Sequence, residues 1–140
     1  MAIQTIYPVL KYEDAHAGMD FLERAFGFER HAVYDGENGG VGHAELKLGD
    51  QYVMLSSTNE GDERFNQGAG RYSLYVVVDD PDAHFTRAKE AGANIERELT
   101  DQDYGSREYT ARDPEGNLWS FGTYRPTPTP SRISASPDSN

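Results

Sequence analysis

Cysteine is absent from the 140-residue sequence, so the chain has no disulfide, thiolate metal site or cysteine nucleophile. Positive charge is scarce: 13 Lys and Arg face 24 Asp and Glu, giving a net charge of −11. This balance argues against nucleic acid or an anionic membrane as partner. No apolar run approaches the roughly 20 residues of a membrane span, and MAIQTIYPVL lacks the basic region of a signal peptide. We therefore expect a soluble, cytoplasmic globular protein.

The first part of the chain predicts one helix and four strands. Residues 3–10 alternate as a strand does, and Pro8 places it at an edge or a bulge. Asp14 can cap a helix over 15–26, which Gly27 ends. Strands are expected over 28–34, 41–48 and 52–56, with a tight turn at Gly49 and Asp50.

The second part repeats this order. A strand over 72–78 precedes a helix that Asp80 caps, that begins at Pro81 and that runs to about residue 91. Three more strands are expected over 94–99, 107–112 and 118–124. The predicted organisation is a first module (1–56), a linker or mobile loop (57–71), a second module (72–124) and a disordered Pro- and Ser-rich tail (125–140).

The two halves are related by a constant offset. The helix caps Asp14 and Asp80 are 66 residues apart, and so are the turn residues Asp50 and Gly116. A helix-cap match and a turn match at one offset indicate a duplication. The predicted fold class is therefore α+β, with two tandem βαβββ modules; two unrelated α+β halves are the alternative.

Strand register predicts which side chains share a face. A two-residue turn at Gly49 and Asp50 pairs Leu46 with Val53 and Ala44 with Leu55, which gives an apolar face for the first helix. Trp119 and Phe121 are expected in the core of the second module. The opposite faces carry aromatic and polar side chains. From these faces and the neighbouring strand positions we predict a ligand pocket with the lining Tyr7, His43, Glu45, Tyr52, Met54, Ser73, Tyr75, Glu108, Thr110 and Ser120.

Several features of this mixed face leave alternatives open. An ordinary solvated sheet face would have the same alternation, although Tyr7, Tyr52 and Tyr75 are large for one. His43 and Glu45 are two residues apart on one strand, with His31 expected nearby; they could form a displaced metal site, an acid/base pair or a structural ion pair. The ion pair is the favoured interpretation.

Other polar residues have simpler predicted roles. His16 and His84 are expected on exposed helix faces. The 57–71 segment could form a lid or the rim of the pocket, with Arg64 and Phe65 as its bulky groups. Most of the acidic residues lie in helix caps and turns, so the negative charge supports a cationic ligand only through its long-range field.

The duplicated unit, the segment KYEDAHAGMDFLERAFGF and the segment YTARDPEGNLWSFGTY resemble the vicinal oxygen chelate superfamily, over residues 3–124. This superfamily includes glyoxalase I, extradiol dioxygenases, fosfomycin resistance enzymes and bleomycin resistance proteins. The resemblance implies a cupped, partly open barrel-like arrangement of two modules, often in a homodimer. Whether the modules pair within or between chains stays open.

The resemblance also implies where a divalent metal would bind in the enzymes of the family. The four positions fall on Tyr7, Met54, Ser73 and Ser120, where the family's enzymes have His, Gln or Glu. Neutral hydroxyls and a thioether bind such ions poorly. We therefore expect no metal and no cofactor at these positions.

The favoured hypothesis is a metal-free binding protein, similar to the bleomycin resistance branch, that sequesters a planar or cationic compound such as an antibiotic. A metal-dependent lyase, isomerase, dioxygenase or thiol transferase is the first alternative. A metal-free enzyme with His43 or Glu45 as general base is the second, and a scaffold without ligand is the third.

Overall fold

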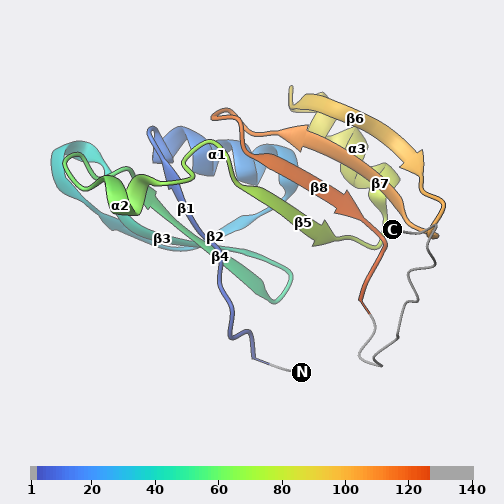
Figure 1. The fold of residues 1–140 in the computed structure, drawn as a ribbon, viewed down its shortest axis with the longest axis horizontal. Coiled ribbons are helices and arrows are strands. Elements are labelled where there is room, and N and C mark those ends of the chain that lie inside the picture. Colours follow the sequence, from blue (N-terminus) through green and yellow to red (C-terminus); the bar gives the residue numbers. More distant parts are fainter. Residues whose placement is uncertain (1–2, 127–140) are drawn as a thin grey trace, which may run out of the picture.

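The computed structural model describes residues 3–126, which form two modules of the same construction (Figure 1). The elements of the first module are β1 (Val9–Tyr12), α1 (Ala15–Phe26), β2 (Glu29–Asp35), the 3₁₀ turn η1 (Glu37–Gly39), β3 (Val41–Leu48) and β4 (Gln51–Ser57). A short helix, α2 (Glu63–Asn66), lies between the modules. The second module consists of β5 (Ser73–Val77), α3 (Pro81–Glu90), β6 (Asn94–Asp101), β7 (Arg107–Arg112) and β8 (Leu118–Gly122).

The sheet topology confirms the predicted fold class. The strand orders are β1-β4-β3-β2 and β5-β8-β7-β6, so each position of the first sheet has its counterpart in the second. The parallel pairs keep the same register: Val9 is opposite Met54, and Tyr75 is opposite Ser120, 66 residues further along both strands. The two sheets do not close into one barrel, as expected of a partly open arrangement.

Local signals in the sequence account for both long helices. The Asp14 carboxylate accepts a hydrogen bond from the Ala17 amide, and the Asp80 carboxylate accepts one from the Ala83 amide, each at 3.1 Å. Such caps satisfy amides that have no partner within the helix. Gly27 ends α1 at φ +86°, a conformation that side-chain-bearing residues rarely adopt. The observed bounds match the prediction for α1 and lie within a residue of it for α3.

The apolar faces meet in one core that both modules share. Ala44, Leu46 and Leu55 are buried as predicted, and the pairing of Leu46 with Val53 is the predicted register. In the second module Trp119 and Phe121 are fully buried. Helices α1 and α3 contact each other, and each packs on its own sheet. The predicted pocket face of each sheet is therefore the one without a helix.

An aromatic cluster joins the modules within this core. The Phe26 ring of α1 lies 4.7 Å from the Phe121 ring and 5.7 Å from the Trp119 ring, centroid to centroid. Phe28 packs edge-on against Trp119 at 5.6 Å. Aromatic side chains bury large areas, so these contacts between residues almost 100 positions apart hold the two halves together.

Polar contacts reinforce the same junction. The Tyr12 hydroxyl donates to the Asp113 carboxylate at 2.6 Å, and both residues are buried. The Glu115 carboxylate accepts from the amides of Glu13 and Asp14, both at 2.7 Å. The DPEGN turn therefore binds the loop before α1 as well as connecting β7 to β8.

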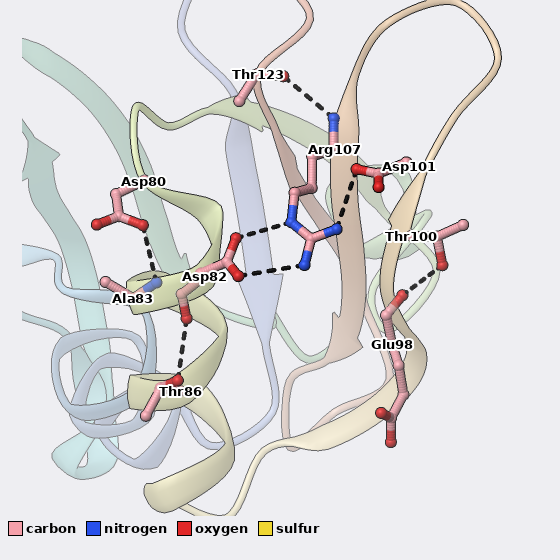
Figure 2. A network of polar contacts seen from close by, with 9 residues as sticks. All are labelled: Asp80, Asp82, Ala83, Thr86, Glu98, Thr100, Asp101, Arg107 and Thr123. Carbon is pink, nitrogen blue, oxygen red and sulfur yellow. Dashed lines mark hydrogen bonds and ion pairs between the residues drawn. The ribbon is translucent and has the colours of Figure 1, made fainter.

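Arg107 connects three elements of the second module (Figure 2). Its guanidinium donates twice to the Asp82 carboxylate of α3, at 2.8 and 3.2 Å, and once to Asp101 of β6 at 3.0 Å. The hydrogen bonds from Arg107 hold the pKa of the Asp82 carboxyl below its usual value. This pair fastens the first turn of α3 to the sheet.

The chain before β1 differs from the prediction. We predicted a strand over 3–10, but β1 begins at Val9 and residues 3–8 form no strand. The Gln4 side-chain amide pairs with β4 instead, because its Oε1 accepts from the Tyr52 amide at 2.7 Å and its Nε2 donates to the Tyr52 carbonyl at 2.9 Å. A side chain thus takes the place of backbone pairing.

The segment between the modules and the C-terminal tail are the two remaining predicted segments. The 57–71 segment, predicted as a linker or mobile loop, contains α2. Of the predicted disordered tail 125–140, residues 127–140 lie outside the described residues. Over residues 3–126, every helix is too short or too polar to cross a membrane.

Candidate ligand-binding site

A cavity of about 220 Å³ lies on the helix-free side of the first module and is lined by four strand residues and one residue before β1: His31, Glu45, Tyr52, Met54 and Tyr7. Four of them belong to the predicted pocket, and His31 was expected nearby. Strand register explains the grouping, since Glu45 lies opposite Met54 across β3 and β4. The wall combines two phenol rings, a thioether, an imidazole and one carboxylate. Such a wall can stack on a planar ligand and place one anionic group against it.

Glu45 lies between two imidazoles. Its Oε2 is 2.9 Å from His43 Nε2, and its Oε1 is 3.9 Å from His31 Nε2. His43, the fifth predicted residue of this sheet, is not part of the cavity wall. The edge-on Tyr52 ring lies 5.1 Å from the His31 ring and orients it. His43 and Glu45 are both partly exposed, so the pair is open to solvent and to a ligand.

The predicted positions of the second module lie on the helix-free face of the other sheet. The Thr110 and Ser120 hydroxyls share a hydrogen bond of 2.8 Å, and Ser73 is exposed at the start of β5. The Tyr75 hydroxyl donates to the Tyr124 carbonyl at 2.8 Å. Glu108 is only 7% exposed.

Glu108 has a partner that the sequence analysis missed. Both its carboxylate oxygens lie 3.0 Å from the Tyr104 hydroxyl, in the loop between β6 and β7. Burial and this carboxylate raise the pKa of the Tyr104 hydroxyl, which therefore stays a donor. The Tyr104 ring meets the Tyr124 ring edge-on at 5.9 Å. One signal in the sequence indicated this contact, since Tyr104 is a bulky aromatic residue within the otherwise polar turn DQDYGS.

The ten predicted residues thus form two separate groups, one on each sheet. The cavity that holds Tyr7, Glu45, Tyr52 and Met54 is lined by the first module alone. Among the hydrogen bonds and ion pairs of residues 3–126, none joins one group to the other. Within residues 3–126 the predicted residues therefore form two separate groups and do not enclose a single cavity.

The residues at the family's metal positions do not fit a divalent metal. Tyr7 precedes β1, Met54 lies on the first sheet, and Ser73 and Ser120 lie on the second. None of these four side chains carries the imidazole or carboxylate donor that such an ion prefers. The Ser120 hydroxyl is engaged with Thr110. Over the part of the chain that the structure describes, no three His, Asp or Glu side chains are arranged to bind a metal ion, and this includes His31, Glu45 and His43.

A second, wider cleft of about 900 Å³ lies between the ends of β1 and β4, the 36–42 loop and the α2 segment. Its lining is mostly polar, and its one lysine, Lys11, donates to the Ser56 hydroxyl at 2.8 Å. None of the ten predicted residues lines it. Ligand pockets are usually lined mainly by apolar and aromatic side chains, so the smaller aromatic cavity is the stronger candidate.

The prediction that His84 is exposed was wrong. His84 lies at the module junction, where its Nε2 donates to the Phe26 carbonyl at 2.9 Å and its Nδ1 accepts from the Tyr109 hydroxyl at 2.6 Å. Burial lowers the pKa of this imidazole, which favours its neutral form. His16 is exposed as predicted, with Nε2 3.1 Å from the Gly39 carbonyl.

The fold agrees with what comparison with known proteins shows. The model of the Glyoxalase/Bleomycin resistance protein/Dioxygenase superfamily matches residues 7–121, and the chain belongs to this superfamily. An uncharacterized protein of Mycobacterium bovis is 31% identical over 121 residues, which are 82% of this chain and 80% of that protein.

Solved structures of similar fold include two of interest for function. TioX from Micromonospora sp. ML1 superposes with a TM-score of 0.71 and 34% identity, over 86% of this chain and all of that one. TnmS3, an antibiotic binding protein from Streptomyces sp. CB03234, has a TM-score of 0.66 and 17% identity, over 89% of this chain and all of that one. The likeness to TnmS3 shows the fold alone.

Proposed function

We propose that the protein is a metal-free binding protein that sequesters a planar organic compound, such as an aromatic antibiotic, on the helix-free faces of its sheets. The observation that carries this proposal is the cavity wall of Tyr7, Tyr52, Met54 and Glu45. Two rings and a polarizable thioether favour a flat ligand, and the carboxylate favours one with a positive or donor group. The antibiotic-binding neighbour TnmS3 supports this ligand class by analogy.

The proposal includes a homodimer, because the cavity of one chain is incomplete. Its 220 Å³ is below the roughly 300 Å³ at which pockets for drug-sized ligands begin, and its wall comes from one sheet. Apolar side chains beside it are exposed, with Ile6 at 84% and Val9 at 51%. A second copy that lays its second sheet over this wall covers these side chains and completes the site.

Binding tests the function directly. We expect calorimetric titration with flat aromatic antibiotics and with bleomycin-like glycopeptides to give saturable heat and a raised melting temperature. Tyr52→Ala should weaken binding by about tenfold or more, because one aromatic contact is lost, whereas Tyr52→Phe should leave it nearly unchanged. Glu45→Gln removes the carboxylate of the cavity wall and should weaken binding of a ligand with a positive group. Glu90→Gln, on the exposed side of α3, removes the same charge away from the cavity and is its control. No heat and no thermal shift with any of these compounds would contradict the proposal.

Assembly and metal content are tested separately. Light scattering should give the mass of a dimer, and Ile6→Glu should shift it toward the monomer; a monomer at micromolar concentration would contradict the homodimer. Metal analysis of protein purified without chelator should find less than stoichiometric metal. A full equivalent of a divalent ion would favour the alternative, a metal-dependent lyase, isomerase, dioxygenase or thiol transferase.

A further inference from the structure

Glu108 is a buried carboxylate that has no ion-pair partner among residues 3–126. Only 7% of the residue is exposed. The guanidinium of its neighbour Arg107 donates hydrogen bonds to Asp82 and Asp101 instead (Figure 2). Burying a charge is costly unless a partner compensates it, and within residues 3–126 this carboxylate accepts hydrogen bonds only from the neutral Tyr104 hydroxyl. The site therefore favours the arrival of a cation.

Three tyrosines form a connected group that reaches this carboxylate through Tyr104. Tyr75 comes from β5, Tyr104 from the β6–β7 loop and Tyr124 from the segment after β8, and they remain 41%, 57% and 47% exposed. Contacts hold them together: Tyr75 donates to the Tyr124 carbonyl, and the Tyr104 and Tyr124 rings meet edge-on. Aromatic rings attract ammonium groups through their negative faces.

Gly122 makes room for the carboxylate. Glu108 and Gly122 are directly paired across β7 and β8. A Cβ at position 122 would lie 2.4 Å from Glu108 Cγ and 2.9 Å from the Tyr75 hydroxyl. Both side chains therefore lie across the bare glycine backbone, which is why a carboxylate and a phenol from different strands meet here.

We propose that Glu108, with the rings of Tyr75, Tyr104 and Tyr124, forms a subsite for an organic ammonium group. The bound cation replaces the Tyr104 hydroxyl as the partner of Glu108. Tyr104 can turn outward to admit it, because it lies in a loop and more than half of its surface is exposed. The positive charge of Arg97 acts against the rise in the pKa of the Tyr104 hydroxyl, so an incoming cation meets some repulsion from it. The inference rests on the proposed function, since the ammonium belongs to the same sequestered ligand.

Choline and its neutral isostere 3,3-dimethylbutan-1-ol are suitable probes, because they share shape and differ in charge. Titration into ¹⁵N-labelled full-length protein should give saturable shifts at the Glu108 and Gly122 amides with choline. We expect choline to bind about tenfold more tightly than the alcohol, the factor that a gain of about 1.4 kcal/mol gives. Equal affinity of the two probes, or no shift at these amides with choline, would overturn the inference.

Variants separate the subsite from the general acidic field. Glu108→Gln keeps the volume and an acceptor for Tyr104, and it should weaken choline binding by about tenfold. Glu98→Gln removes an exposed charge of β6 and should have no effect; equal losses in both variants would overturn the inference. Tyr104→Phe keeps the ring but removes the competing hydrogen bond, so choline should bind at least as tightly as to the unaltered chain.

The failure of this inference is distinguishable from failure of the proposed function. A planar antibiotic that binds with the same affinity to Glu108→Gln and to the unaltered chain would preserve the proposed function and remove the ammonium subsite. If choline shifts the Glu108 amide but no planar compound binds, the ammonium subsite would be preserved and the proposed function removed.

Discussion

The Tyr12 hydroxyl donates a 2.6 Å hydrogen bond to Asp113, a carboxylate 101 residues away in the other module. Asp113 also accepts from the Trp119 indole at 3.1 Å and from the Asn117 side chain at 3.0 Å. Burial, with Asp113 close by, raises the pKa of the Tyr12 hydroxyl, which favours the protonated form that donates this hydrogen bond. One carboxylate thus fixes both its own turn and the junction between the modules.

Tyr12→Phe should destabilise the protein by about 1–3 kcal/mol, because a buried hydrogen bond to a charged acceptor is lost without a cavity. The check is urea unfolding followed by tryptophan fluorescence, since Trp119 shares the acceptor. Tyr34→Phe is the control: Tyr34 is 61% exposed, and its loss of a hydroxyl should change the free energy of unfolding by less than about 0.5 kcal/mol. Equal effects of the two substitutions would contradict the role given to Asp113.

His84 should make stability depend on pH. Its pKa is lowered in the folded state from the ordinary 6.5, so the unfolded chain binds more protons in the interval between the two values. Its contribution is complete above about pH 6.5 and is lost as the pH falls toward the folded pKa, by at most about 1.4 kcal/mol per pH unit.

The measurement compares urea midpoints at neutral pH and near pH 5 for the unaltered chain and for His84→Gln. The substitution should flatten the decline on acidification, whereas the exposed His16→Gln should leave it unchanged. An equally steep decline in His84→Gln would assign the pH dependence to other groups.

Gly122→Ala should destabilise the chain by about 1–3 kcal/mol, because the added methyl group overlaps Glu108 Cγ at 2.4 Å. Gly61→Ala is a useful contrast, since a Cβ there meets nothing within 4 Å and only the positive φ of +89° opposes it. Thermal unfolding should rank Gly122→Ala as the more damaging of the two. The reverse order would show that Glu108 moves aside freely.

Gln4→Ala should release the segment before β1 from β4. Its side chain makes two hydrogen bonds to the Tyr52 backbone, each worth about 0.5–1.5 kcal/mol. Faster hydrogen exchange of the Tyr52 amide, with exchange in β7 unchanged, is the expected result. Gln4→Glu keeps the acceptor for that amide and should protect it better than alanine does. Unaltered exchange in both variants would contradict the tether.

The elements that local chemistry determines were predictable. Asp14 and Gly27 cap a helix, and Gly49–Asp50 forms a turn. Each of these features depends on residues only a few positions apart, and the structure has all three where they were predicted. The strand predicted over 3–10 failed, because alternation cannot distinguish backbone pairing from pairing by the Gln4 side chain. Likewise nothing near His84 in the sequence reveals that Phe26 will lie beside it.

The candidate site was predictable only where it lies on strands. Register placed Glu45 and Met54 side by side, and the structure agrees. Tyr104 and Tyr124 lie in irregular segments, for which periodicity gives no face, so their approach to Glu108 emerged from the structure alone. The separation of the two groups of site residues depends on how the modules pack, which strand patterns do not encode.

The aromatic cluster at the junction has a consequence for how the duplicated chain holds together. Phe26 belongs to one half by sequence, yet its closest aromatic neighbour is Phe121 of the other. If the chain is cut between the modules, each fragment exposes an apolar surface that is complementary to the surface of the other fragment. The pieces should therefore reassociate when mixed, and the intact chain should melt in a single transition.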